Sequence, residues 1–382
     1  MARGTKRIAV KGLICGVLFL FLAVAGTAPC LAKVSTEIKC SVCHTMHNSQ
    51  AGESMVVGGG DEQPNLLRNT CLGCHSATDG STWKDSATGA PIVYNTSAPS
   101  YGATIGDGKR FGLAAGNFYW VTQDCEQGHD IFTADTYLTE APGNNRGCDN
   151  DSCHKNLHEP YTGSSDSHLV GRSGCQGCHM VSGDADGASS VTSWHHANDG
   201  TSGTAYIVDT AEQGWYRFLS GHHSAYTKGV SGIEDPDWEH SPTSTVHNEY
   251  LASHTLDAYD SKKGMIKQGK VMTGFCSGCH GEFHWQSSSL IGGAWYRHPS
   301  DYFIPNEDEY AGMSTTYNPL VPVARWTLSA VSPTVAPGTD LVMCLSCHRA
   351  HAGPYNDMLR WDYQNADDLT SAWGCLQCHT EK

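Results

Sequence analysis

The stretch Cys344-Leu-Ser-Cys-His348 is repeated, with Gln in place of Ser, at Cys375-Leu-Gln-Cys-His379 near the C-terminus. This repeated pattern decides what kind of fold the chain forms. Cys-x-x-Cys-His occurs six times in 382 residues, whereas random placement of 17 Cys and 21 His predicts about 0.04 copies. In this motif the two thiols add to the vinyl groups of a haem, and the His that follows binds its iron. The sequence therefore predicts a covalently bound c-type haem at each copy.

Seven sites share this chemistry, because a seventh motif has the same residues with a four-residue spacer, from Cys148 through Cys153 to His154. The predicted thioether cysteines are Cys40, Cys43, Cys71, Cys74, Cys148, Cys153, Cys175, Cys178, Cys276, Cys279, Cys344, Cys347, Cys375 and Cys378. The predicted proximal iron ligands are His44, His75, His154, His179, His280, His348 and His379. Zinc knuckles and redox dithiols also pair cysteines, but neither requires a His directly after the second Cys. Seven haem c groups are the predicted cofactors.

The first 32 residues have the pattern of a signal peptide. A basic start precedes the apolar run 13–25, and small residues before position 33 suit cleavage after Ala32. A lipoprotein anchored at Cys30 is the alternative, which Pro29 disfavours. We therefore expect an exported protein with an extracellular or cell-surface location, reached through the periplasm, and no transmembrane segment once the signal is removed. Cys125 is the one cysteine left over, and we expect it to be inert or to pair with another subunit.

The mature chain is strongly acidic. Removing the signal takes away four basic residues and leaves 20 Lys and Arg against 39 Asp and Glu, a formal charge of −19. Such a surface excludes nucleic acid and anionic lipid as natural partners. Other cytochromes with cationic patches, or oxidised metals outside the cell that act as electron acceptors, fit the charge better.

Composition also limits the fold. Hydrophobic residues make up 39% of the chain, Gly numbers 42, and polar stretches such as 76–89 interrupt each periodic pattern. We predict a mostly irregular fold with short α-helices and few short strands, in which the haems supply much of the core. The motif spacing predicts a signal peptide at 1–32, an N-terminal di-haem region at 33–140, a middle di-haem region at 141–270 and a C-terminal tri-haem region at 271–382.

Histidines are abundant enough to give each iron a second imidazole. Fourteen His lie outside the motifs, and seven second ligands are needed. Four of the fourteen follow a motif closely, namely His47, His158, His284 and His351. A His three or four residues after the proximal ligand cannot reach the far side of its own porphyrin, so it either serves another haem, which we expect, or is an exposed surface residue. For His351 the expected recipient is the haem of Cys375 and Cys378. Iron with two imidazole ligands has no open position, which favours electron transfer over catalysis.

Several phrases around the motifs resemble the doubled-CXXCH cytochromes of metal-respiring bacteria, and in particular their filament-forming extracellular nanowires of the OmcE type. One such phrase is Arg297-His298-Pro-Ser-Asp301. The phrases occupy residues 40–50, 117–120 with 128–129, 275–280 with 283–284, 297–301 with 304–306, and 344–351 with 360–362. The similarity covers about 100 residues at the start of the mature chain and about 110 at its end. The middle region departs from the pattern, since filament subunits of that type carry fewer haems.

The resemblance implies second iron ligands at His47, His129, His298 and His351, one of which serves an iron in the next subunit of a head-to-tail polymer. For the middle region we select His158, one of His195 and His196, and His247, with His284 in reserve. The resemblance thus implies a multihaem electron conduit that is not an enzyme and that assembles with copies of itself into a filament. Three alternatives remain: a monomeric carrier, a multihaem reductase with one open iron, and a structural protein whose haems support folding.

Overall fold

The computed structural model describes the chain in separate segments between residues 49 and 380. The described residues are 49–50, 53–54, 71–133, 142, 157, 174–179, 207–210, 213, 215–219, 229–253, 259–260, 265–266, 270–277, 279–280, 290–291, 294–295, 298–364 and 373–380. Within them, helices and strands are short and irregular backbone predominates, which confirms the predicted fold class. Helix and strand thus provide local anchoring points and do not set the overall shape.

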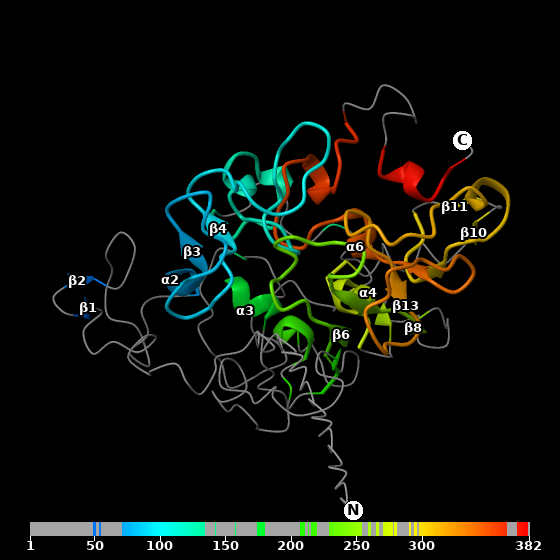
Figure 1. Cartoon of the computed structure of the whole chain (residues 1–382), viewed down its shortest axis with the longest axis horizontal. Coiled ribbons are helices and arrows are strands. Elements are labelled where there is room, and N and C mark those ends of the chain that lie inside the picture. Colours follow the sequence, from blue (N-terminus) through cyan, green and yellow to red (C-terminus); the bar gives the residue numbers. More distant parts are fainter. Residues whose placement is uncertain are drawn as a thin grey trace, which may run out of the picture.

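A short helix lies at, or directly before, each described Cys-x-x-Cys-His motif. The α-helices are α2 (Leu72–His75), α3 (Gly174–Cys178), α4 (Met272–Cys276), which ends at the first cysteine of its motif, and α6 (Cys344–Cys347), and the last motif forms the 3-10 helix η10 (Cys375–Gln377). Residues three apart share one face of a helical turn, so the two thiols of each motif point the same way. Turns this short are not stable alone, and tertiary contacts must hold them. Figure 1 shows these motifs following one another across the molecule, from α2 through α3, α4 and α6 to the red C-terminal segment.

A six-stranded sheet connects the middle and C-terminal regions. Its order is β12 (Tyr302–Phe303), β14 (Leu341–Val342), β13 (Ala324–Arg325), β7 (Glu249–Leu251), β6 (Gly232–Ile233) and β5 (Ile207–Val208). Neighbours are antiparallel except β13 and β7, which are parallel. Since β14 ends two residues before α6, the sheet fixes where the sixth motif begins.

The remaining elements are two-residue strands and single 3-10 turns. The strand pairs are β1 (Ser49–Gln50) with β2 (Glu53–Ser54), β3 (Ser76–Ala77) with β4 (Tyr94–Asn95), β8 (Tyr259–Asp260) with β9 (Met265–Ile266), and β10 (Leu290–Ile291) with β11 (Ala294–Trp295). The other 3-10 turns are η2 (Trp120–Thr122), η3 (Cys125–Gln127), η6 (Tyr216–Phe218), η8 (Asp308–Tyr310) and η9 (Asn356–Met358).

Apolar side chains of the described residues gather in several separate clusters and do not form one continuous core. The largest cluster includes Tyr216, Tyr250, Phe275 and Leu345, and the attachment residues Cys178 and Cys276 pack against its edge. A second cluster is built around Phe118, Trp120 and Ala352. Apolar protein surface thus lies directly beside the cysteines that the sequence assigns to haem.

An ion network fixes the strands beside the sixth motif. Glu249 of β7 is fully buried and accepts a hydrogen bond from Arg325 Nε at 3.1 Å, and the guanidinium of Arg325 also pairs with Asp340. Asp340 directly precedes β14. Because removing one partner from a buried pair leaves an uncompensated charge, this network specifies how β7, β13 and β14 meet.

Candidate haem-binding sites

The proximal histidines of the described motifs are held by their Nδ1 atoms. Nδ1 of His75, His179, His280 and His348 lies 2.8 Å from the carbonyl oxygen of Pro91, Arg217, Pro142 and Asp357, respectively. A carbonyl oxygen only accepts, so Nδ1 carries the proton and Nε2 keeps its lone pair. Metal-binding histidines are oriented by this kind of bond. Each imidazole is therefore prepared to bind iron through Nε2.

The last motif uses a carboxylate instead. Nδ1 of His379 lies 3.1 Å from Oε1 of Glu309, in the 3-10 turn η8. Thr380 reinforces the contact, since its backbone N–H and its hydroxyl both donate to the carbonyl oxygen of Glu309, at 2.8 and 2.9 Å. An anionic acceptor makes the imidazole a stronger electron donor than a carbonyl does. The C-terminal site thus differs electronically from the other four.

Burial keeps these imidazoles neutral. Loss of solvation is the largest cause that lowers the pKa of His75, His179 and His348, and it lowers the pKa of His280 to about 4. A protonated ring has no lone pair for a metal, so a lowered pKa favours the form that binds iron.

Histidines outside the motifs face three of the proximal ligands. The ring centres of His129 and His280 are 6.1 Å apart, those of His351 and His179 are 5.8 Å apart, and those of His298 and His379 are 6.1 Å apart. Two imidazoles that bind one metal ion from opposite sides, through bonds of about 2 Å, have centres about 6 Å apart. The spacing in all three pairs is that of imidazoles with an iron between them.

Two of these three histidines outside the motifs also form a hydrogen bond through Nδ1. Nδ1 of His129 lies 2.8 Å from the carbonyl oxygen of Ala350, and Nδ1 of His298 lies 2.9 Å from that of Pro299. His351 is oriented differently, by stacking on Phe118 with ring centres 4.6 Å apart. Burial lowers the pKa of His351 to about 3. The residues present therefore fit a haem with an imidazole on each face.

The partner of His351 differs from the one expected. The structure places His351 against a proximal ligand of another motif, as the local geometry requires, but this ligand is His179 and not His379. His379 is faced by His298. The reason is a long-range contact: Ala352 forms bridges with Gly116 and Gly128, which turn residues 350–352 toward the N-terminal region and away from the C-terminus.

His247 has a different environment from the other selected histidines. Its Nδ1 lies 3.0 Å from the carbonyl oxygen of Thr243, and its Nε2 lies 3.3 Å from Oε1 of Glu249. Its ring stacks on Tyr317 at 3.7 Å, and its side chain is fully buried. With both nitrogens engaged, this ring offers iron no lone pair without rearrangement, so the structure gives no support for His247 as a ligand.

Several expected site residues lie outside the described part of the chain. They are Cys40, Cys43, His44, His47, Cys148, Cys153, His154, His158, His195, His196 and His284, together with the signal segment 1–32. Five of the seven expected attachment sites therefore have a structural description. In the described part, Cys125 is exposed, and no cluster of three or more Cys, His, Asp or Glu side chains could hold a metal ion on its own. No helix there is long and apolar enough to cross a membrane.

Sequence reasoning missed the residues that orient the imidazoles. Glu309 is 70 positions from His379, and Phe118 is more than 200 positions from the ring it stacks on. No local pattern marks these pairs, since their side chains meet only after distant segments fold together.

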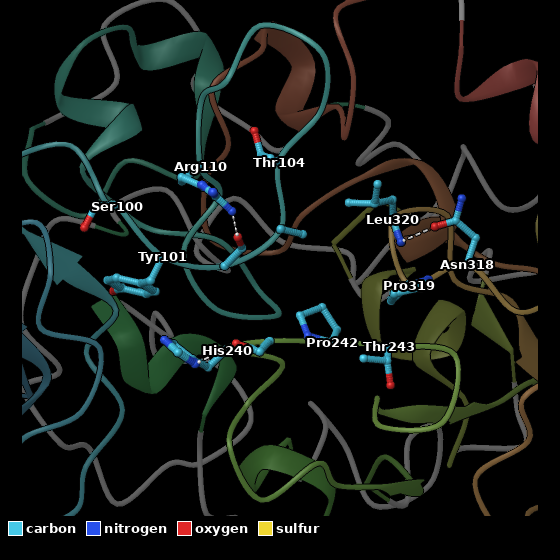
Figure 2. A pocket seen from close by; sticks show the side chains of 13 residues that line it. Ser100, Tyr101, Thr104, Arg110, His240, Pro242, Thr243, Asn318, Pro319 and Leu320 are labelled. Atoms are coloured by element: carbon cyan, nitrogen blue, oxygen red, sulfur yellow. Dashed lines mark hydrogen bonds between the residues drawn. The ribbon is translucent and has the colours of Figure 1, made fainter.

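A cavity of about 600 Å³ lies between the N-terminal region and residues 318–320 (Figure 2). Tyr101, Arg110 and His240 line it, and Arg110 Nη1 donates to the carbonyl oxygen of Gly102 at 2.9 Å. His240 stacks on Trp83 with ring centres 4.2 Å apart. None of the thirteen lining residues belongs to a Cys-x-x-Cys-His motif, so this cavity is not one of the described attachment sites.

Comparisons with known proteins agree with the motif chemistry. Residues 336–382 match the model of the doubled CXXCH motif. The chain is 25% identical over 372 aligned residues to the C-type cytochrome OmcS of Geobacter sulfurreducens, and the alignment covers 85% of this chain and 78% of OmcS. This coverage includes much of the middle region, which the resemblance in sequence left unmatched.

Two solved structures are similar to the fold. They are the Outer Membrane Cytochrome S filament from Geobacter sulfurreducens, with a TM-score of 0.42, and a cryo-EM structure of the OmcS nanowires from the same organism, with a TM-score of 0.44. Each is 20% identical to this chain, and each comparison covers 87% of this chain and 84% of the other. The doubled motif at 336–382 and the relation to OmcS show that the chain is similar to the doubled-CXXCH multihaem c-type cytochromes.

Proposed function

We propose that this protein is an exported seven-haem cytochrome that conducts electrons along a chain of closely spaced haems, each with two imidazole ligands. It works outside the cell, as a filament built from copies of itself. Other cytochromes and oxidised metals are its partners, and electron transfer is its activity in place of catalysis on a substrate.

The main support for this proposal is the pairing of proximal histidines with histidines outside the motifs. Three proximal histidines have a second imidazole at 5.8 to 6.1 Å, which supports assigning His351 to the haem of Cys175 and Cys178, His129 to that of Cys276 and Cys279, and His298 to that of Cys375 and Cys378. When bound, each haem supplies an iron that takes up and releases one electron. An iron held on both faces has no vacant position for a substrate, so it favours transfer over reaction chemistry.

The protein's own residues hold the imidazoles in place. Carbonyl oxygens hold the proton on Nδ1 of His75, His179, His280 and His348, so these rings undergo no proton transfer when the iron changes oxidation state. The ligands are already oriented, and little rearrangement accompanies each transfer.

Assembly into a filament has two supports. OmcS, to which the chain is related, gives its name to solved filament structures. In addition, His298, the histidine that faces the proximal ligand of the last motif, is an exposed residue, which supports a position of this site near the protein surface. A copy that covers this site with a different surface of its own makes a head-to-tail contact, which propagates unless its rotation closes a ring.

Three measurements on the secreted protein test the proposal. Intact mass is expected to exceed the mature polypeptide by seven haems, with Cys148 and Cys153 both in thioether linkage. Electron paramagnetic resonance of the oxidised protein is expected to show low-spin iron throughout, and negative-stain microscopy to show unbranched filaments. A high-spin iron in the native protein would contradict the conduit and favour a reductase, and a monodisperse monomer would contradict the filament and favour a discrete carrier.

A further inference from the structure

Arg360 is a buried cation bound directly to the sixth motif in chain order, residues 344–348. It is 1% exposed, and its Nε donates to the carbonyl oxygens of Leu345 at 2.6 Å and of His348 at 3.1 Å. Its backbone N–H donates to the carbonyl oxygen of Cys347 at 2.8 Å. The guanidinium is therefore held against α6 and against the backbone of the proximal iron ligand.

A second buried cation lies beside the same motif. Arg349 directly follows the proximal ligand and is 2% exposed, and its Nη1 donates to the carbonyl oxygens of Leu113 at 3.2 Å and Ala114 at 2.8 Å. Among the described residues, neither Arg349 nor Arg360 forms an ion pair with Asp or Glu. Arginine stays protonated in proteins, so two full positive charges adjoin the sixth motif without an ion-pair partner.

Two acids oppose these charges without pairing with either arginine. Glu239 is buried and acts on Arg349. Asp357 is exposed, and its backbone carbonyl accepts from Nδ1 of His348. Beyond the effects of burial and of this bond, the carboxylate of Asp357 raises the pKa of His348 and the charge of Arg360 lowers it. Because water and salt screen an exposed charge more than a buried one, the effect of Arg360 is the one that persists at high ionic strength.

The proximal ligand of the last motif is bonded to a charge of the opposite sign. Nδ1 of His379 lies 3.1 Å from Oε1 of Glu309, whereas His348 is bonded through its own carbonyl oxygen to Arg360. Oxidised iron has one more positive charge than reduced iron. A nearby carboxylate therefore favours the oxidised state, and a nearby guanidinium favours the reduced state.

A short segment joins these two motifs in space. Arg360 is bonded to the sixth motif, and the ring of the next residue, Trp361, packs on Gly374, where an added Cβ would lie 2.0 Å from that ring. Gly374 directly precedes the last motif. Residues 318–319 add a second connection, through hydrogen bonds with Arg360 and Gln377. The two attachment sites are therefore neighbours.

We propose that Arg360 raises the reduction potential of the sixth haem, that of Cys344 and Cys347, so that an electron shared by the last two haems resides on it and not on the C-terminal haem. In this step one electron leaves the reduced C-terminal iron and reduces the oxidised iron of the sixth haem, and no bond forms or breaks. Arg360 is a positioning residue, because it acts through the backbone of the proximal ligand. The inference rests on the proposed function, to which it adds a direction between two haems.

Redox titration of the complete, haem-loaded protein, followed by electron paramagnetic resonance, tests the proposal. The C-terminal haem is identified by the low-spin signal lost in His298→Ala, and the sixth haem by the signal altered in His348→Met, which keeps both thioether bonds. In the wild type the sixth haem is expected to be reduced at the higher potential. Arg360→Gln keeps a donor for the carbonyl oxygens but removes the charge, so it is expected to lower this potential. Arg360→Lys keeps the charge and is expected to restore it.

An opposite charge change at an exposed position is the matched control. Asp357→Asn keeps the backbone carbonyl that accepts from His348, and Asn tolerates the φ of 56° at this position. It is expected to raise the potential of the sixth haem at low salt only, whereas the decrease in Arg360→Gln is expected to persist at high salt.

The order of the two potentials in the wild type decides the inference even if Arg360→Gln does not fold. A sixth haem reduced at or below the potential of the C-terminal haem would overturn it, as would an unchanged potential in a folded Arg360→Gln that keeps all its low-spin signals. High-spin iron in the wild type, or loss of electron conduction with this order of potentials intact, would instead contradict the proposed function.

Discussion

The backbone N–H of His129 donates to the carbonyl oxygen of His351 at 3.0 Å, although the two residues are 222 positions apart. The imidazole of His129 is also bonded through Nδ1 to the carbonyl oxygen of Ala350. One strap, residues 350–352, therefore presents its own imidazole to His179 and orients a second imidazole toward His280. The ligands proposed for two different haems depend on one local contact.

Because both ligands depend on the strap at residues 350–352, we expect one substitution that displaces the strap to disturb the iron ligation of two haems. A Cβ added at Gly128 would lie 2.4 Å from Cβ of Ala352 and 2.6 Å from the carbonyl oxygen of His351. Gly128→Ala is therefore expected to push the strap away and to produce high-spin iron at two sites, seen by electron paramagnetic resonance. Gly353→Ala is the matched control, since its Cβ meets nothing closer than 3.4 Å. One altered haem, or an equal effect of the control, would contradict the coupling.

Removing His351 alone is expected to affect a single haem. His351→Ala takes away the ring that faces His179, so the haem of Cys175 and Cys178 is expected to become high-spin while that of Cys375 and Cys378 stays low-spin. In a background that already lacks Cys175 and Cys178, the same substitution is expected to add no high-spin iron. His298→Ala serves as the comparison and is expected to convert the C-terminal haem. If His351→Ala changes the C-terminal haem, the pairing derived from the ring positions is wrong.

The pairing of motif histidines with histidines outside the motifs could be predicted from the sequence only in part. The prediction that His179 is a proximal ligand needs only five adjacent residues of sequence. Spacing also excluded His351 as a ligand for its own haem, but the recipient depends on bridges from Ala352 to Gly116 and Gly128. His247 was selected by position, and its engagement with Glu249 and Tyr317 arises only when the sheet assembles.

A buried carboxyl makes stability depend on pH. Asp301 is 5% exposed, and burial raises the pKa of its carboxyl to about 7, against the smaller, opposite effects of Thr273 and the backbone of Ser253. An unfolded Asp has a pKa of about 3.9, so between these values the folded chain binds the additional proton. The free energy of unfolding therefore falls as the pH rises from about 4 through about 7.

Asp301→Asn is expected to remove this dependence and to stabilise the protein above pH 7, by up to about 4 kcal/mol. Asn tolerates the left-handed backbone of position 301, where φ is 53°, so little strain is introduced. Urea unfolding at several pH values gives the measurement. The control is Asp308→Asn, because Asp308 has the same φ of 53° and an exposed side chain. Parallel pH profiles of wild type and Asp301→Asn would refute the assignment.

The charge of Glu309 is expected to set the potential of the C-terminal haem. Among the described proximal ligands, His379 has a carboxylate on Nδ1 where the others have carbonyl oxygens. A full negative charge at 3.1 Å strengthens the imidazole as a donor and stabilises oxidised iron over reduced iron. Glu309→Gln keeps an acceptor at this place but removes the charge, so the potential of this haem is expected to rise, without loss of its low-spin signal.

Glu307→Gln is the matched control for this last prediction. It makes the same charge change two residues away, at an exposed side chain that precedes η8. Redox titration of the three proteins, followed by the low-spin signal that disappears in His298→Ala, assigns the shift to one haem. Since surface charges are screened by salt, a general electrostatic effect would appear in both variants and fade at high ionic strength. An equal shift in both would show that the hydrogen bond from His379 to Glu309 does not tune this site.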